Sequence, residues 1–422
     1  MAADEGSAFP PDRRRALRRA LLLLGVFFVF VQINRSGGGV LANYLGAERG
    51  LSPTDLGAVM GAMFFASAVV QLPTGLLFDR YGATRTLVGL GLVSLVGIVL
   101  FAVAEATSSL VAGRVLIGLG HGGVITAVYL IAMGWAPPDR VAQATAGLVG
   151  IAGGTGAVLA TTPLAVALEQ YGLRTTFLGL AGATAVLTLV IALLVRDRPA
   201  ATAAAPVRPP ESFADSMRGL VEVITMSELR RIFAMGVCFT APFMTVGGLW
   251  AGPYFRDLQG LSPESASLAL LMMMVALHVG TFAYGPLERW ARSRKRLVLT
   301  GVMIEVVCLG VLAIWPTAPL VLAAGVLFLF GCAAPFYVVL ASHARAFVPS
   351  HRVGRALTCI NLAGLTGVFV LQIATGAVID AVDRVGGAPE TGYRLVFATI
   401  VVVLLLAAWA YAGQSEKPRE TA

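Results

Sequence analysis

The chain has 422 residues, of which 57% are hydrophobic and only 13% are charged, and its mean hydropathy is +0.82. About a quarter of the residues of a soluble protein are charged, so this composition excludes a soluble globular protein. The formal net charge is +8, and it needs no nucleic-acid partner because the basic residues gather between apolar segments.

Twelve apolar runs follow one another, each long enough for a helix to cross a hydrocarbon core of about 30 Å. They cover residues 17–44, 54–78, 84–105, 108–134, 141–167, 173–195, 229–255, 264–288, 297–315, 318–343, 353–380 and 392–413. Only helices or a closed barrel satisfy every backbone group in lipid, and runs without period-two alternation are typical of helices. We therefore predict an all-α membrane protein of twelve transmembrane helices in the lipid bilayer.

One long connection divides the runs into two sets of six. Residues 196–228 are polar and rich in Pro and Ala, as in a linker. We predict six-helix bundles at 1–195 and 229–422, joined by this linker. Of the 31 Lys and Arg, 24 lie at the termini and in the even-numbered connections. The positive-inside rule therefore predicts cytoplasmic termini and a cytoplasmic linker, in the inner membrane of the cell.

Two other sequence features have simpler explanations than they first suggest. The basic stretch RRRALRR resembles the start of a signal peptide, but the apolar run after it is too long and has no small-x-small cleavage site, so we expect a retained first span. Four single cysteines within spans are typical of apolar packing residues: Cys238, Cys308, Cys332 and Cys359. We expect no metal and no cofactor.

The connection after the second span concentrates charge in a short turn, TGLLFDRYGATRTL at residues 74–87. A related basic stretch, GPLERWARSRKRL, follows the eighth span, and its Gly285 lies 210 residues after Gly75. PPDRVAQA and PSHRVGRA form a second pair, with Arg140 and Arg352 separated by 212 residues. The similar offsets indicate an internal duplication, which suits a carrier whose halves rock about a central site.

The pattern G-x-L-x-D-R-x-G-x-x-R in this turn resembles the signature loop of the major facilitator superfamily. The twelve spans, the linker and Arg114-x-x-x-Gly118 also match that family. The resemblance implies that the turn latches the two halves on the cytoplasmic side, and that the gating residues are Gly75, Asp79, Arg80, Gly82, Arg85, Arg140 and Arg352. Asp79 can meet the positive N-terminus of the eleventh span. The alternative is a basic anchor with a tight turn at Gly82, which would not need the aspartate.

Ionisable groups inside a membrane are costly and indicate a pathway or a binding site. A helix rises about 1.5 Å per residue. By this count, Arg35 of the first span and Arg114 of the fourth lie at comparable depth, on the outer side of the membrane centre. Two cations at one depth repel each other unless an anion lies between them, and a guanidinium matches a carboxylate or phosphate. We therefore predict an anionic small-molecule substrate held by both arginines. The alternative is that each arginine snorkels outward or pairs structurally.

Other substrate-site candidates are polar or aromatic side chains of the first, seventh and eleventh spans: Gln32, Asn34, Trp250, Tyr254, Asn361 and Gln372. Trp250 and Tyr254 are four residues apart on one helical face, and we expect Gly252 and Pro253 to break that helix near its outer end. The alternative for both aromatic residues is the interfacial belt, where Trp and Tyr collect.

The stretch NRSGGGV and the second span look like the corresponding part of the organic anion:cation symporters within the superfamily. Those carriers have an Asp-Arg pair in the first span and often an acid two turns below the arginine of the fourth span. This chain has Asn34 and His121 at these places. His121 titrates near physiological pH, so it is our first candidate for proton coupling, ahead of Glu305 and His278. The alternative is that His121 only packs and forms hydrogen bonds.

These observations predict a secondary transporter and not an enzyme. The sequence has no Walker A motif for ATP-driven transport, and no span has the acid cluster or His set of an active site. We expect alternating-access transport of a small organic anion, coupled to protons, by a monomer. Drug or metabolite efflux by proton antiport is the alternative, because the glycine-rich fifth span loosely resembles a motif of drug:proton antiporters.

Overall fold

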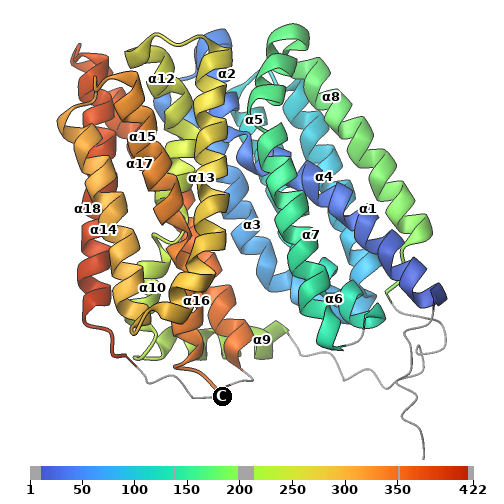
Figure 1. The fold of residues 1–422 in the computed structure, drawn as a ribbon. Coiled ribbons are helices and arrows are strands. Elements are labelled where there is room, and N and C mark those ends of the chain that lie inside the picture. The colour runs from blue at the N-terminus through green and yellow to red at the C-terminus, as the bar shows by residue number, and fades with distance from the viewer. Residues whose placement is uncertain (1–10, 137, 198–212, 350–351, 417–422) are drawn as a thin grey trace, which may run out of the picture.

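The structure is a computed structural model that describes residues 11–136, 138–197, 213–349 and 352–416. These residues form long helices joined by short connections (Figure 1), and no strand occurs among them. The prediction of an all-α fold is confirmed.

The helices fall into two sets on either side of the expected linker. We call the first set the N-terminal half; it comprises α1 (Pro11–Ser36), α2 (Gly38–Arg49), α3 (Pro53–Tyr81), α4 (Ala83–Val103), α5 (Thr107–His121), α6 (Val124–Trp135), α7 (Pro138–Leu159) and α8 (Thr162–Leu194). The C-terminal half comprises α10 (Arg230–Gly236), α11 (Ala241–Thr245), η2 (Val246–Trp250), α12 (Ala251–Gln259), α13 (Pro263–Trp290), α14 (Arg294–Ile314), α15 (Leu320–Ala333), η3 (Ala334–Phe336), α16 (Tyr337–Arg345), α17 (Val353–Arg384) and α18 (Pro389–Ala412). Helix α9 (Phe213–Thr225) lies between them in the chain.

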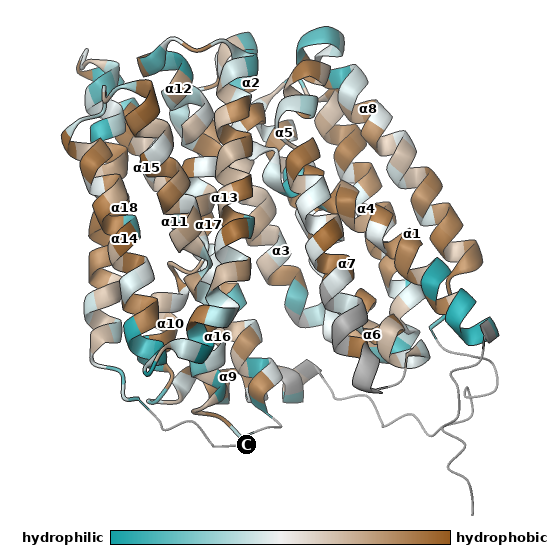
Figure 2. Cartoon of the chain, viewed as in Figure 1, coloured by the Kyte–Doolittle hydropathy of each residue, from teal (hydrophilic) through white to brown (hydrophobic). Residues whose placement is uncertain are grey.

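Eleven helical segments of the described chain are long and apolar enough to cross a membrane, and Gly147–Leu159 is a shorter apolar helix. The fifth and sixth predicted spans share α8, which bends at Gly172, where φ is 72° and ψ is 171°. This conformation is open to glycine and strained for other residues. Twelve transmembrane helices are consistent with this arrangement, and Figure 2 shows apolar residues along the helices with hydrophilic residues gathered at the ends.

Two spans have breaks that position the candidate site. The first span changes direction at Gly37, between α1 and α2. The predicted break at Gly252 and Pro253 is wrong, because both residues lie inside α12. The irregular turn is one turn earlier, where η2 is a π-helix. Pro253 has no N–H to donate to the carbonyl of Leu249, so the hydrogen-bond ladder widens in the preceding turn.

The start of α1 and the end of α18 lie at the same end of the helices as α9. We call this end the terminal face (bottom of Figure 1) and the opposite end the distal face. The most extensive contact between the halves is that of α3 with α17, and α13 also packs against α7 and α8. The boundary between the halves therefore runs along these helices.

Candidate substrate site and gates

Arg35 is a cation that has no partner of opposite charge among the described residues. It lies in the last turn of α1, beside the break at Gly37, and its guanidinium carbon is 5.6 Å from the ring centre of Phe64 in α3, a cation–π distance. It is partly exposed, and no described residue forms a hydrogen bond or ion pair with its side chain. Tyr337 of α16 lies within electrostatic range. Arg35 is therefore an unpaired charge at the boundary between the halves.

Arg114 of α5 has the opposite character, because its side chain is fully buried (0% exposed). It donates to the carbonyls of Asn34 at 3.0 Å and Val59 at 3.4 Å, and its guanidinium carbon lies 5.7 Å from the ring centre of Phe101. Asn34 is near the end of α1, where helical carbonyls lack partners and a cation is favourable. These contacts favour the structural role that was the alternative from the sequence, and substrate binding by Arg114 stays a prediction.

Tyr337 was missed by the sequence analysis. It begins α16, after the 3-10 turn around Pro335, and its ring packs edge-on against Phe239 at 5.3 Å. The only local signal is the proline two residues before it, which interrupts the tenth span. Its contribution to the site comes from the packing of α16 opposite α1, which a single sequence does not reveal.

The amide candidates divide by exposure. Gln32 and Asn361 are partly exposed, whereas Asn34 is 1% exposed and Gln372 is 0% exposed. Asn34 donates to the Phe30 carbonyl at 3.0 Å, and Gln372 donates to the Met244 carbonyl at 2.9 Å. The amide oxygens of both buried residues have no partner among the described residues. Gln32 and Asn361 are therefore the candidate amides whose side chains are partly exposed in this conformation.

Trp250 and Tyr254 are buried, with 2% and 0% of their surface exposed. The Trp250 indole donates to the hydroxyl of Thr375 in α17 at 2.8 Å. The Tyr254 hydroxyl donates to the Pro316 carbonyl at 2.8 Å, and its ring packs edge-on against Tyr393. Both side chains therefore bond and pack within the C-terminal half in this conformation, and a role for them in substrate binding stays a prediction.

The three coupling candidates lie in different places. His121 ends α5, and its Nε2 is 2.9 Å from the Ser94 hydroxyl of α4, within electrostatic range of Arg35 and Arg114. The Nδ1 atom of His278 is 2.7 Å from the Met274 carbonyl.

Glu305 is 1% exposed in α14, and its Oε2 has no partner among the described residues. Its electrostatic neighbours are Cys238, Tyr284 and Cys308, all of the C-terminal half.

Glycines bring the two halves into backbone contact toward the distal face. A Cβ atom added to Gly38 of α2 would lie 2.3 Å from the Gly248 carbonyl oxygen, and one added to Gly39 would lie 2.4 Å from that of Gly247. Distances under 3.0 Å are almost never found for real Cβ atoms. The contact of α2 with η2 therefore depends on the absence of side chains.

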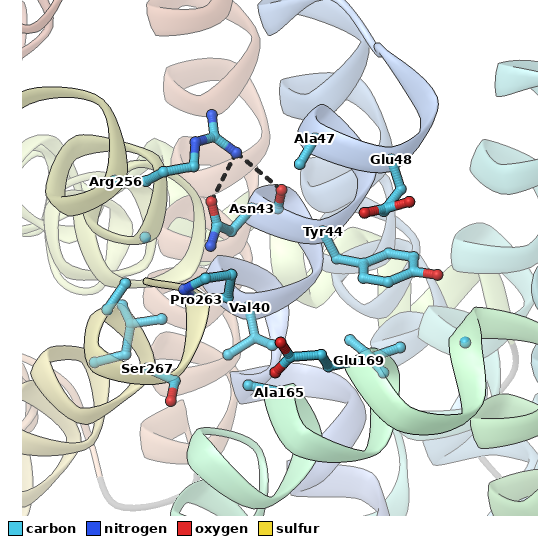
Figure 3. A pocket seen from close by; sticks show the side chains of 15 residues that line it. Val40, Asn43, Tyr44, Ala47, Glu48, Ala165, Glu169, Arg256, Pro263 and Ser267 are labelled. Atoms are coloured by element: carbon cyan, nitrogen blue, oxygen red, sulfur yellow. Dashed lines mark hydrogen bonds between the residues drawn. The ribbon is translucent and has the colours of Figure 1, made fainter. Parts of the chain in front are cut away.

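Polar contacts close the same face. The Asp380 carboxylate of α17 accepts from the backbone N–H of Thr54 at 3.0 Å and also from its hydroxyl. Arg256 of α12 donates to the carbonyl of Asn43 at 3.0 Å and to its side-chain oxygen at 2.8 Å (Figure 3). Asp380 binds the first turn of α3, where a helix favours negative charge. These contacts were missed because each joins residues more than 200 positions apart.

A cavity of about 250 Å³ lies beside these contacts, between α2, α8, α12 and α13. Figure 3 shows Glu48 and Glu169 among its lining residues, together with Tyr44 and Arg256. Two carboxylates disfavour an anion, and Arg256 is already bound to Asn43. This cavity is therefore a poor candidate for the predicted anion site.

The terminal face has no such latch between the described residues of the signature turn and the C-terminal half. Asp79, Arg80 and Arg85 are exposed, and Arg80 stacks on neighbouring Tyr81 at 5.4 Å. Gly82 has φ 83°, as a tight turn requires. Gly75 is exposed, and a Cβ there would meet nothing within 4 Å.

The residues near that turn, and those expected to act with it, form other contacts. Arg352, at the start of α17, forms an ion pair with Glu222 of α9 at 3.3 Å. Asp197, missed from the sequence, accepts from the backbone of Ala83 and Thr84 at 2.9 and 2.7 Å and caps α4. The side chain of Arg140 lies outside the described residues.

Two helical halves, a boundary cation and a latch on one face define the class of a multi-pass membrane transporter. The family model of the Major Facilitator Superfamily matches residues 22–341, and the chain belongs to that family. This confirms the resemblance seen in the signature turn, and with it the prediction of a transporter in place of an enzyme.

Comparisons with individual proteins agree with this assignment. The chain is 23% identical over 412 residues to a hexuronate transporter of Bacillus subtilis, covering 91% of this chain and 93% of that one. It is 26% identical over 373 residues to a gentisate transporter of Corynebacterium glutamicum, covering 86% and 81%. Among solved structures, a nucleoside transporter superposes with a TM-score of 0.75 at 15% identity, over 94% of this chain and 100% of that chain. These structural likenesses show the fold.

Proposed function

We propose that the chain is a secondary transporter that moves a small organic anion across the membrane by alternating access. The observation that carries this proposal is Arg35, a partly exposed cation at the boundary of the halves with no acidic partner among the described residues. A charge inside the membrane is tolerated where it is paired or lines a pathway. A carboxylate substrate would supply the missing negative charge, and Gln32, Asn361 and Tyr337 would add hydrogen bonds to it.

The relatives support an organic acid as the substrate class. Their names specify hexuronate, gentisate and tartrate, which are small hydroxylated carboxylates. A guanidinium fork matches a carboxylate in two hydrogen bonds, and amide and phenol groups suit the hydroxyls. We therefore place this chain's substrate among small hydroxylated organic acids.

The proposed topology follows from charge and contacts. With 24 of 31 Lys and Arg at the termini and on the linker side, we infer that the terminal face is cytoplasmic, in the inner membrane of the cell. The distal contacts and the unlatched signature turn then correspond to a monomeric carrier that faces inward. Two six-helix bundles at residues 1–195 and 229–422 would rock about the site, joined by residues 196–228.

Proton coupling is part of the proposal, with His121 as the first candidate because it lies within electrostatic range of both arginines. A proton on His121 would add positive charge beside the anion, so proton and anion would bind cooperatively. Glu305 and His278 lie in the C-terminal half and are the next candidates.

The test is substrate counterflow in proteoliposomes with a panel of uronates, aromatic hydroxy acids and tartrate. Arg35→Gln should lower the affinity for the transported acid at least about tenfold, as expected for a lost charged hydrogen bond, and Arg35→Lys should restore it only in part. Arg174→Gln, which removes an exposed arginine of α8, is the matched control. Unchanged affinity in Arg35→Gln would refute the anion site.

A further inference from the structure

A shallow groove of about 570 Å³ runs along the outer surface of the C-terminal half, between α14 and α15. Its lining is apolar except at one end, and includes Leu299, Met303, Ile304, Val307 and Leu329. Val307 is 61% exposed and Leu329 is 52% exposed. Such residues face lipid in a membrane protein, so the groove opens toward the bilayer and not toward the substrate pathway.

One cation stands at the end of the groove nearest the terminal face. Arg296 lies in the first turn of α14 and lines the groove, and it is exposed. Its side chain has no hydrogen bond or ion pair with the described residues. The nearby acids are engaged, because Glu288 pairs with Arg294 at 2.8 Å and Glu416 accepts from the backbone of Arg294.

The length of the groove matches one acyl chain. The lining residues of α14 recur at three- and four-residue intervals from Arg296 to Val307, so they share one helical face. Eleven residues at about 1.5 Å each give about 16 Å, and one leaflet of a hydrocarbon core of about 30 Å is about 15 Å thick. A chain lying in the groove would therefore reach from the headgroup level to the centre of the bilayer.

We propose that this groove binds one anionic glycerophospholipid, with its phosphate-containing headgroup at Arg296 and an acyl chain along α14 and α15. The free guanidinium supplies charge complementarity to a phosphate bearing an anionic headgroup, and the apolar walls supply contact for the chain. A zwitterionic lipid fits the same walls, but its headgroup has no net negative charge and is attracted less strongly to Arg296. Bound lipid would join α14 to α15 along the terminal half of the membrane.

The test is native mass spectrometry of the delipidated full chain, titrated with phosphatidylglycerol or phosphatidylcholine of the same acyl chains. The wild type should bind phosphatidylglycerol about fivefold more tightly, the worth of one basic residue near an anionic headgroup. Arg296→Gln should abolish that preference. Arg292→Gln, which removes a neighbouring exposed arginine that does not line the groove, should change it less than about twofold.

Two further variants test the groove itself. Val307→Trp and Leu329→Trp fill it from opposite walls, and both should weaken the binding of both lipids. Glycerol phosphate without acyl chains should not compete. Equal losses in Arg292→Gln and Arg296→Gln would overturn the proposal in favour of diffuse attraction. Wild-type binding in both Trp variants, competition by glycerol phosphate, or a second copy of the chain in place of lipid would also overturn it.

Discussion

Arg35 and Arg114 show how two residues of one type, in similar apolar surroundings, can have different roles. Both interrupt apolar runs, so the sequence predicts two intramembrane cations and correctly singles both out as unusual. Arg114 satisfies carbonyls at the end of α1, whereas Arg35 lacks a partner of opposite charge among the described residues. The difference depends on a break at Gly37 and on packing against α3, and neither follows from the spacing of the arginines.

Arg114 should therefore matter for stability more than for affinity. We expect Arg114→Gln to destabilise the protein by about 2 kcal/mol, because the buried Asn34 carbonyl loses a charged donor. Thermal unfolding in detergent should show a lower midpoint, while the folded protein keeps its affinity for the substrate within a few fold. Loss of anion binding at an unchanged melting temperature would instead return Arg114 to the substrate site.

His121 provides the prediction for pH dependence. If His121 carries the coupling proton, anion affinity should rise as the pH falls through the range in which this histidine titrates, because its positive charge then lies near the anion. Binding and uptake measured over a series of pH values should show this dependence in the wild type. His121→Gln should exchange anion for anion without responding to pH. The same pH profile in the mutant would transfer the role to Glu305 or His278.

At the scale of elements, the helices and their order could be predicted, because length and apolar composition determine what can cross a bilayer. The positions of the breaks within the helices were harder to predict. The sequence predicted a break at Gly252 and Pro253, but the effect of Pro253 falls on the turn that its missing N–H would have joined, so η2 lies before it. The distal contacts could not be predicted, since Thr54 with Asp380 and Asn43 with Arg256 are determined by how distant helices pack.

The glycine contact between α2 and η2 gives a prediction at this scale. Gly38→Ala should hold the distal face open, because the new methyl group would meet the Gly248 carbonyl, which is backbone and cannot turn aside. An Ala47→Cys label site on a cysteine-free background should then react faster with an impermeant maleimide. Gly89→Ala is the matched control, since a Cβ there meets nothing within 4 Å. Equal labelling in both variants would show that the contact does not control closure.

For the whole molecule, two carboxylates occupy corresponding places on one helix pair. Asp79 lies in the last turn of α3, at the terminal face, and Asp380 lies toward the distal end of α17, against the first turn of α3. Each carboxylate can bind the N-terminus of the other helix, where negative charge is favoured. Among the described residues, the distal contact is made and the terminal one is not, which agrees with one latch being closed in each facing.

The two latches should therefore shift the molecule in opposite directions. Asp380→Asn should increase distal labelling at Ala47→Cys, because an amide accepts a weaker hydrogen bond than a carboxylate does. Asp79→Asn should reduce distal labelling, since it weakens the closure of the terminal face that accompanies distal opening. The double variant should lie between the two. Shifts of the same sign would mean that these residues act on stability in general and not on facing.

If the conformation with the closed distal face is the resting state, transport should have different half-saturating concentrations from the two sides of the membrane. A solute arriving from the distal side must meet a conformation in which the Asp380 contacts and the glycine contact are broken, and the apparent dissociation constant rises in inverse proportion to the fraction of molecules in that conformation. A solute on the terminal side would bind the resting state directly, so its apparent dissociation constant would not be raised in this way. The half-saturating concentration for influx should then exceed that for efflux, even though the proposed contact of Arg35 with the carboxylate is the same in both directions. Equilibrium binding in detergent would report the terminal-side value, so a ligand screened there can look far tighter than its uptake kinetics indicate.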